Sequence, residues 1–389
     1  MIKKTALLVF AVLFIAGFAH SLDLNISGEI KTGLFWDNVH FDGEDPSKSA
    51  RLHHNEDAGS NEGRFRMDMH LQTEGNFGMR VRFEQESWTG SPPIRWDYAY
   101  AYGNFIDNQL GVTAGLLGLS PWTKKSRDIL EELETFGIRF EFKPNATPGL
   151  NFGLTLNRFN KFDTRILPGE DEVRTLANLL LESVFGVTYK NDFFEGMFSW
   201  RLDGDYDHSR QVFQGTDVIR FNEGHEFMYY LSPTIVSTIV PYLSVWANGW
   251  WTGLVNDDVH DEDKSFRNWL YAEYNPENFI AELALGLEIN GTDSHFFRTR
   301  AGFYYNIFPF LSAGSAFRMN LNFGDNIPDF DTFYRLITIE PEVRVTLGTA
   351  VFSLVYSFSH GYIVVPTDNV PKTGMGTNHW INLRAVISF

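Results

Sequence analysis

Arginine residues recur at alternate positions in several short segments, with apolar residues between them. Because side chains alternate between the two faces of a β-strand, each set would lie on one face. Arginine stays charged at any relevant pH, so such a face would give a fixed positive field. Acidic residues such as Asp68 and Glu84 would lie on the same face as the arginines. The alternative is therefore that the opposite charges pair and have a structural role only. The early set comprises Arg64, Arg66, Arg80, Arg82 and Arg95, and the later positions are Arg139, Arg298, Arg300, Arg318, Arg344 and Arg384.

Aromatic residues form a second alternating pattern. If Leu243, Val245 and Ala247 face outward, one inward row contains Tyr242, Trp246 and Trp250, and the next segment adds Trp269 and Tyr271. Rings on an enclosed face can stack on sugars. With the faces reversed, the same rings belong to an interfacial girdle, where Trp and Tyr concentrate. The sequence leaves both interpretations open.

Catalytic and metal-binding patterns are weak. Ser357 and Ser359 lie near His360, and His260 lies near Ser265, but neither set forms a recognisable nucleophile–base motif. The run Asp203-Gly-Asp205-Tyr-Asp207 has the carboxylate spacing of a calcium loop, but it has His208 where glycine is needed. The chain contains no cysteine, which excludes disulfides and thiolate chemistry. We therefore expect no enzyme activity, no metal and no cofactor.

The amino-acid composition narrows the class of protein further. The formal net charge of the 389 residues is −17, which disfavours nucleic-acid binding because that function needs a basic footprint. Aromatic residues make up 16% of the chain, yet its mean hydropathy is −0.20. Membrane barrels combine these properties, since the lipid face is apolar and aromatic while the lumen and loops are polar.

Period-2 alternation extends over most of the chain and predicts β-strands throughout. One example is the run of Trp96, Tyr98, Tyr100 and Tyr102, which alternates with Arg95 and Asp97 and so predicts these rings opposite the arginines. Long polar connections are expected near 37–62, 119–134, 160–181, 204–222, 252–265, 322–331 and 361–375. Tight turns are expected near 74–76, 143–149, 190–192, 275–278, 306–309 and 347–349. Strands of about ten residues then number about 18, or 16 if the stretch 224–275 contains two fewer.

Both ends of the chain carry export features. Lys3 and Lys4 precede an apolar run from Ala6 to Phe18, and small residues flank His20. Residues 1–21 are therefore predicted to be a cleaved signal peptide, followed by one domain at 22–389. The chain ends in an amphipathic strand that closes on Phe389, and this strand resembles the C-terminal assembly signal of Gram-negative outer-membrane β-barrels.

This architecture resembles the porin superfamily of the Gram-negative outer membrane, both general and sugar-specific porins. The resemblance implies a transmembrane antiparallel β-barrel, and the partners would be outer-membrane lipid, the barrel assembly machinery and small hydrophilic solutes. It also implies a homotrimer as the default assembly. In general porins the third outer loop narrows the pore. Here that segment is Leu119 to Glu134, with charges of both signs at Lys124, Lys125, Asp128, Glu131 and Glu132.

The expected function is passive diffusion of small hydrophilic solutes through an aqueous channel. One alternative is a carbohydrate-preferring channel that uses the aromatic row. An alternative of another class is a surface adhesin or structural barrel that acts through its outer loops.

Overall fold

The computed structural model describes residues 22–41, 47–52, 64–73, 76–85, 94–119, 132–158, 183–202, 225–252, 265–290, 294–323, 334–365 and 372–389. The predicted signal peptide lies outside these ranges. Within them, no helix is long and apolar enough to cross a membrane.

Nineteen strands and one short helix make up the described chain. Their bounds are β1 Leu22–Phe41, β2 Ser47–Leu52, β3 Arg64–Thr73, β4 Phe77–Gln85, β5 Arg95–Phe105, β6 Leu110–Leu119, β7 Glu132–Phe142, β8 Leu150–Arg158, β9 Val184–Lys190, β10 Glu195–Leu202, β11 His225–Ser232, α4 Ile235–Ile239, β12 Leu243–Thr252, β13 Ser265–Tyr274, β14 Phe279–Asn290, β15 Ser294–Phe308, β16 Leu311–Phe323, β17 Tyr334–Leu347, β18 Ala350–Val365 and β19 Lys372–Ser388.

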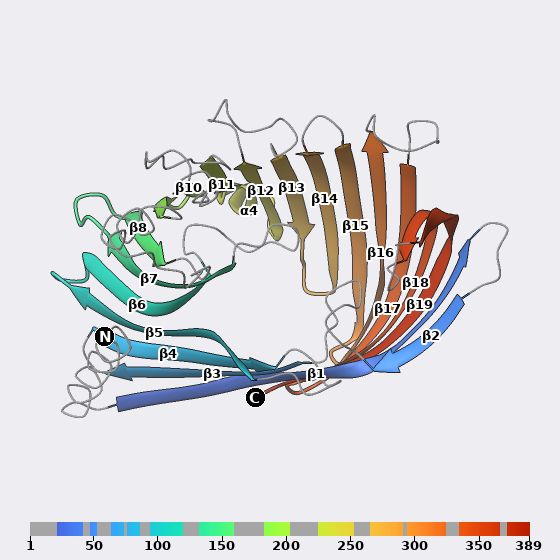
Figure 1. Ribbon diagram of the computed structural model, residues 1–389, viewed down its shortest axis with the longest axis horizontal. Helices are drawn as coiled ribbons and strands as arrows, with labels where there is room; N and C mark the ends of the chain where they lie inside the picture. The colour runs from blue at the N-terminus through green and yellow to red at the C-terminus, as the bar shows by residue number, and fades with distance from the viewer. Residues whose placement is uncertain are drawn as a thin grey trace, which may run out of the picture.

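The strands form a closed antiparallel barrel (Figure 1). From β3 to β19 each strand pairs with the next, and β1 closes the ring by pairing with both β19 and β3. This gives 18 positions around the wall and confirms the predicted number. Strand β2 adds no position to the ring. It pairs with residues 34–39 of β1, on the same edge of β1 where β3 pairs with residues 22–31. The expectation that 37–62 is entirely a loop was therefore wrong.

The two faces of the wall differ in exposure and polarity. On β13, Leu270 is 49% exposed while its neighbour Trp269 is 6% exposed. Outward positions on other strands are likewise large and apolar, for example Leu24, Leu283 and Leu383. The alternate positions carry the charged and polar side chains. The hydrocarbon of a membrane cannot hydrogen-bond to an open strand edge. A closed barrel has no open edge, and an apolar outer face suits contact with lipid.

Tight turns join the strands at one end of the barrel, and turn-forming residues occupy them. Asn191 accepts hydrogen bonds at Oδ1 from the backbone N–H groups of Phe193 and Phe194, at 2.9 and 2.8 Å, which closes the β9–β10 turn. Gly348 takes the left-handed conformation between β17 and β18, where glycine has no Cβ penalty. Two further short connections, 106–109 and 233–242, were not among those predicted. The second contains α4, which Pro233 and Pro241 flank.

The seam of the barrel involves the last residue of the chain. The backbone groups of Gly28 and Phe389 exchange two hydrogen bonds, of 2.8 and 3.0 Å. A Cβ at residue 28 would lie 2.4 Å from the ring of Phe389 and 2.7 Å from the backbone oxygen of Arg66, so any larger residue would force the seam to shift. Phe389 thus contacts the first strand at the point where the ring closes.

Candidate functional site

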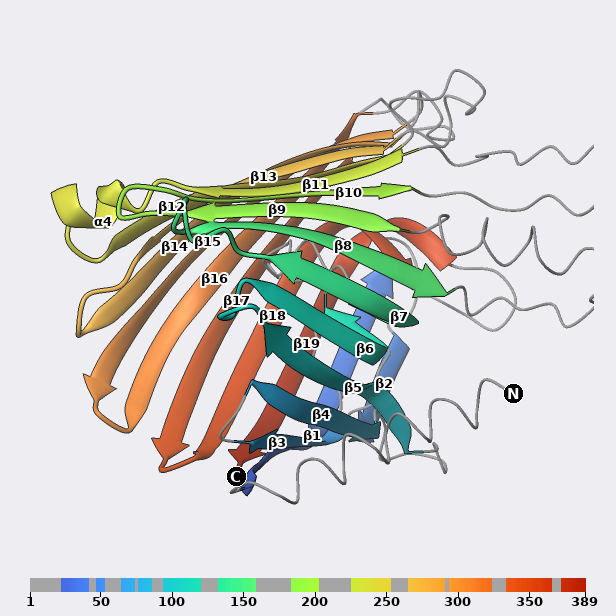
Figure 2. The same cartoon turned by 90° about the vertical axis from the view of Figure 1, so that its left-hand side faces the viewer.

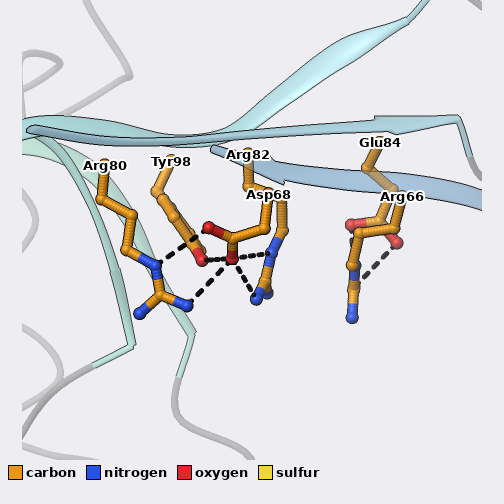
Figure 3. A network of polar contacts seen from close by, with 6 residues as sticks. All are labelled: Arg66, Asp68, Arg80, Arg82, Glu84 and Tyr98. Atoms are coloured by element: carbon orange, nitrogen blue, oxygen red, sulfur yellow. Dashed lines mark hydrogen bonds and ion pairs between the residues drawn. The ribbon is translucent and has the colours of Figure 1, made fainter. Parts of the chain in front are cut away.

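A network of ion pairs covers the inward face of β3, β4 and β5 (Figure 3). The guanidinium of Arg66 donates to both carboxylate oxygens of Glu84, at 2.8 and 2.9 Å. Arg80 donates to Asp68 through Nε and one terminal nitrogen, at 3.0 and 2.9 Å. Arg82 donates to Oδ2 of the same carboxylate, at 3.2 and 2.9 Å. One aspartate therefore bridges two arginines on a neighbouring strand.

The carboxylates lie deeper in the wall than the arginines. Asp68 is 7% and Glu84 is 3% exposed, whereas the side chain of Arg80 is 42% exposed. The five charged side chains of this network are three arginines and two carboxylates. The arrangement presents cations toward the enclosed space and buries the anions beneath them. It combines both interpretations of the sequence, because the pairs hold the wall together while the guanidinium of Arg80 stays accessible.

Tyr98 belongs to this network, which contradicts the predicted face. A β-bulge in the β4–β5 pairing sets Arg82 opposite Tyr98 and Phe83 opposite Trp96, so residue 97 has no register partner on β4. The extra residue moves Tyr98 and the following tyrosines to the inward face. The Tyr98 hydroxyl donates to Asp68, and the guanidinium of Arg82 lies 4.5 Å from the centre of its ring.

Several predicted site residues have no described side chain. By backbone register, Arg64 lies opposite Lys31 and Arg95 lies opposite Glu84. Both positions belong to the face of the wall that carries the network. Lys124, Lys125, Asp128 and Glu131 lie outside the described residues. Glu132 begins β7 and pairs with Leu119, so the predicted loop is shorter than 119–134 because both strands extend into it.

The later arginines also pair with carboxylates, and sequence reasoning missed these partners. Glu288 bridges Arg267 and Arg298, each at 3.0 Å. The remaining pairs are Arg300–Glu282 at 2.8 Å, Arg318–Glu340 at 2.8 Å, Arg344–Glu342 at 3.0 Å and Arg384–Glu342 at 3.7 Å. The available signal was the alternation of faces, since each glutamate lies at an inward position. Glu282, Glu288 and Glu340 pair with arginines of neighbouring strands, and Glu342 pairs with Arg344 of its own strand.

The aromatic residues of β12 and β13 lie together on the inward face. Trp246 stacks on Tyr271 with ring centres 5.1 Å apart, and Trp269 stacks on the same tyrosine at 6.0 Å. The Arg267 guanidinium lies 4.8 Å from the centre of the Trp250 ring. These four rings therefore share a face with the charges and are not part of an outward girdle. Tyr242 does not join their row, because it lies in the turn before β12 with φ of 69° and is largely exposed.

The described residues contain no group of three or more potential metal ligands. The acidic segment at 203–207, which has calcium-like spacing, lies outside them, and so does His260. Ser357 and Ser359 lie on the inward face of β18, in register with Trp380 and Asn378. The Ser359 and Thr338 hydroxyls hydrogen-bond to each other at 2.9 Å.

Comparison with known proteins identifies the fold. No family model matches the sequence, and no curated protein is similar enough in sequence to match. Among solved structures, Pseudomonas aeruginosa OccK2 (OpdF), solved in complex with glucuronate, gives a TM-score of 0.56 at 11% identity and covers 94% of this chain and 98% of its own. OccK3 (OpdO) of the same organism gives 0.55 at 9% identity, covering 97% and 99%. OpdQ gives 0.53 at 10% identity, covering 94% and 98%. The chain therefore has the fold of these outer-membrane porins.

Proposed function

We propose that this protein is an outer-membrane porin through which small hydrophilic solutes diffuse passively. The observation that carries the proposal is the closed ring of 18 strands with charged residues on its inward face and apolar residues outside. A barrel of this size is wide enough for an aqueous channel. No chemical step is needed, and we propose no enzyme activity.

The arginine network gives the channel a preference for anions. Arg80 and Arg82 both pair with the carboxylate of Asp68, and the side chain of Arg80 is 42% exposed, so its charge is accessible to a passing ion. The preference is moderate, because most of the arginine charge is compensated and salt screens the remainder. The predicted constriction stays part of the proposal for the connection between β6 and β7, residues 120–131, with its acidic charges opposite this wall.

The test is single-channel recording of the purified, refolded full chain in a planar bilayer, with the reversal potential measured across a salt gradient. Stable ohmic steps with an anion-selective reversal potential are expected. A chain that folds, as judged by heat-modifiable migration on a gel, but gives no steps would contradict the porin proposal. The outer loops would then be the place to look for an adhesin function.

The second candidate is a channel that prefers carbohydrates, and the stacked rings of Trp246, Tyr271 and Trp269 favour it. A row of several rings suits an oligosaccharide better than a single sugar. Saturable block of the current by maltotriose is the expected result. A current that maltotriose leaves unchanged at all concentrations would remove this candidate.

Location and partners follow from the proposed function. The apolar outer face requires lipid, and the tight turns at one end suit the periplasmic side. Export by the signal peptide at 1–21, recognition of Phe389 by the barrel assembly machinery, and assembly into a homotrimer remain predictions. Cross-linking of the protein in native membranes would report the number of subunits.

A further inference from the structure

A cavity of about 210 Å³ opens on the inward face of β5, β6 and β7, strands that lie side by side in Figure 2. Within the cavity β6 contributes the small inward residues Gly111 and Thr113, whereas the neighbouring strands contribute longer side chains there. Its polar lining consists of Tyr100, Tyr102, Asn104, Thr113, Arg139 and Glu141. We call this cavity the β6 niche.

Strand register places the long side chains on both sides of β6. Thr113 pairs with Tyr102 on one side and with Arg139 on the other. Gly111 pairs in the same way with Asn104 and Glu141. The niche lies toward the end of the barrel with the tight turns, because the turn at 106–109 follows Asn104 directly and the turn at 143–149 begins just after Glu141.

The niche adjoins the arginine network through tyrosines. The rings of Tyr98 and Tyr100 have centres 5.6 Å apart, and Tyr98 donates to Asp68. The hydroxyl of Tyr102 lies 2.9 Å from Nε2 of His70. A solute that moves from the long loops to the tight turns would therefore pass the arginines first and the niche second.

Other contacts within the wall fix the two charged groups of the niche. Arg139 is buried and donates through Nε to the hydroxyl of Thr155 at 3.4 Å. Glu141 forms an ion pair with Lys143 at 3.5 Å. The lining itself carries one charge of each sign, Arg139 and Glu141, whereas Lys143 is 52% exposed and does not line the niche. The niche thus offers donors and acceptors in a fixed arrangement with no excess charge of its own.

We propose that the β6 niche is a binding subsite for an uncharged polyhydroxylated solute of monosaccharide size, a proposal that rests on the porin function above. Hydroxyl groups both donate and accept, so they match a lining of phenol, amide, guanidinium and carboxylate groups. Tyrosine rings beside these groups suit the apolar face of a sugar. The volume is below the roughly 300–1,000 Å³ of pockets that hold drug-sized ligands, which limits the occupant to about one sugar ring.

The test uses D-glucose as the probe with the full chain in detergent, followed by saturation-transfer NMR, which detects weak binding without any current. The wild type is expected to give a saturable glucose signal. Thr113→Leu fills the niche and should raise the Kd by about tenfold or more through steric exclusion. Ala114→Leu adds the same side chain to the outward face of the same strand and should leave binding unchanged.

A second pair of variants reports hydrogen bonding with little change in volume. Tyr100→Phe should raise the Kd by about fivefold, the effect of one lost hydrogen bond. Tyr304→Phe is the matched control, because Tyr304 lies on the opposite wall beside Arg344 and its ring is retained. Heat-modifiable migration and single-channel conductance confirm that each variant folds into a barrel.

The outcomes separate the niche from the porin function. A wild-type chain that conducts but gives no glucose signal, or a signal that Thr113→Leu leaves intact, would overturn the niche and leave the porin function standing. Glucose binding that depends on Thr113 in a chain that does not conduct would keep the site and remove its role in transport. Displacement by D-glucuronate at about one-tenth the glucose concentration would show that the occupant is anionic and would overturn the proposed class of solute.

Discussion

The charged wall of β3–β5 and the aromatic wall of β12 and β13 both rest on alternation of side chains between two faces, but they expose their functional groups to different extents. On the charged wall, Asp68 is buried and Arg80 extends over it toward the lumen. On the aromatic wall, Trp269 and Tyr271 are both buried, with Trp246 stacked on Tyr271. The first wall keeps its charge available to a passing ion. The second covers much of its ring surface with its own rings.

The difference shows that the residue types on a face do not by themselves determine what the face can bind. Cross-strand partners decide how much charge or ring surface remains. Asp68 holds two arginines without neutralising both, whereas each stacked ring reduces the surface that a sugar could contact. We therefore expect the charged wall to govern selectivity and the aromatic wall to contribute less than its ring content suggests.

Removal of the shared carboxylate should have the largest effect. Asp68→Asn leaves Arg80 and Arg82 side by side without their common anion. The free energy of unfolding should fall by about 3 kcal/mol, the low end for breaking a buried ion pair, because Arg80 keeps contact with water. Urea titration of the gel-shift transition measures this change. Anion selectivity should rise in the same variant, and a loss of stability without that rise would mean that the network is only structural.

Removal of the two arginines should change selectivity in the opposite direction. In Arg80→Ser/Arg82→Ser, the five-charge network loses two positive charges and becomes net negative. Two unit charges about 8 Å from a passing ion are together worth about 1 kcal/mol in water, or about a fivefold change in permeability ratio at low salt. The reversal potential should therefore shift toward cations, and less so in high salt. Arg318→Ser/Glu340→Gln, which removes one charge of each sign from an ion pair, is the neutral control. Equal shifts in the two variants would remove the special role of the charged wall.

The sequence predicted the strand number and most inward faces, because period-2 alternation survives wherever one face meets lipid. It failed at residue 97, since an evenly alternating run from Trp96 to Tyr102 gives no sign of a bulge. The bulge moved Tyr98 into the network and Tyr100 and Tyr102 into the β6 niche. Ion-pair partners such as Glu288 were also missed, because pairing depends on register between strands and register is set by turns.

Truncation of Trp246 tests whether the aromatic wall contacts a sugar. This ring is only partly buried where it packs against the cluster, so Trp246→Ala removes ring surface at lower cost than Trp269→Ala. If maltotriose blocks the wild-type current, the half-blocking concentration should rise by about fivefold to tenfold, the effect of one lost stacking contact of about 1 kcal/mol. Trp36→Ala on the outward face of β1 is the control. Unchanged block in Trp246→Ala would assign the sugar contact to another part of the lumen.

The smallest effect concerns a polar residue beneath the aromatic wall. Asn248 is 1% exposed, and neither amide atom has a hydrogen-bond partner among the described residues. In register it lies between Tyr230 and Trp269. A buried amide without partners costs about 1–3 kcal/mol. Asn248→Leu keeps the number and branching of the side-chain heavy atoms, although its methyl groups are larger, and should stabilise the barrel by about 1 kcal/mol in urea titration. A loss of stability instead would mean that water reaches this amide between the rings. The aromatic wall would then be more open than its stacking indicates, and the contrast with the charged wall would narrow.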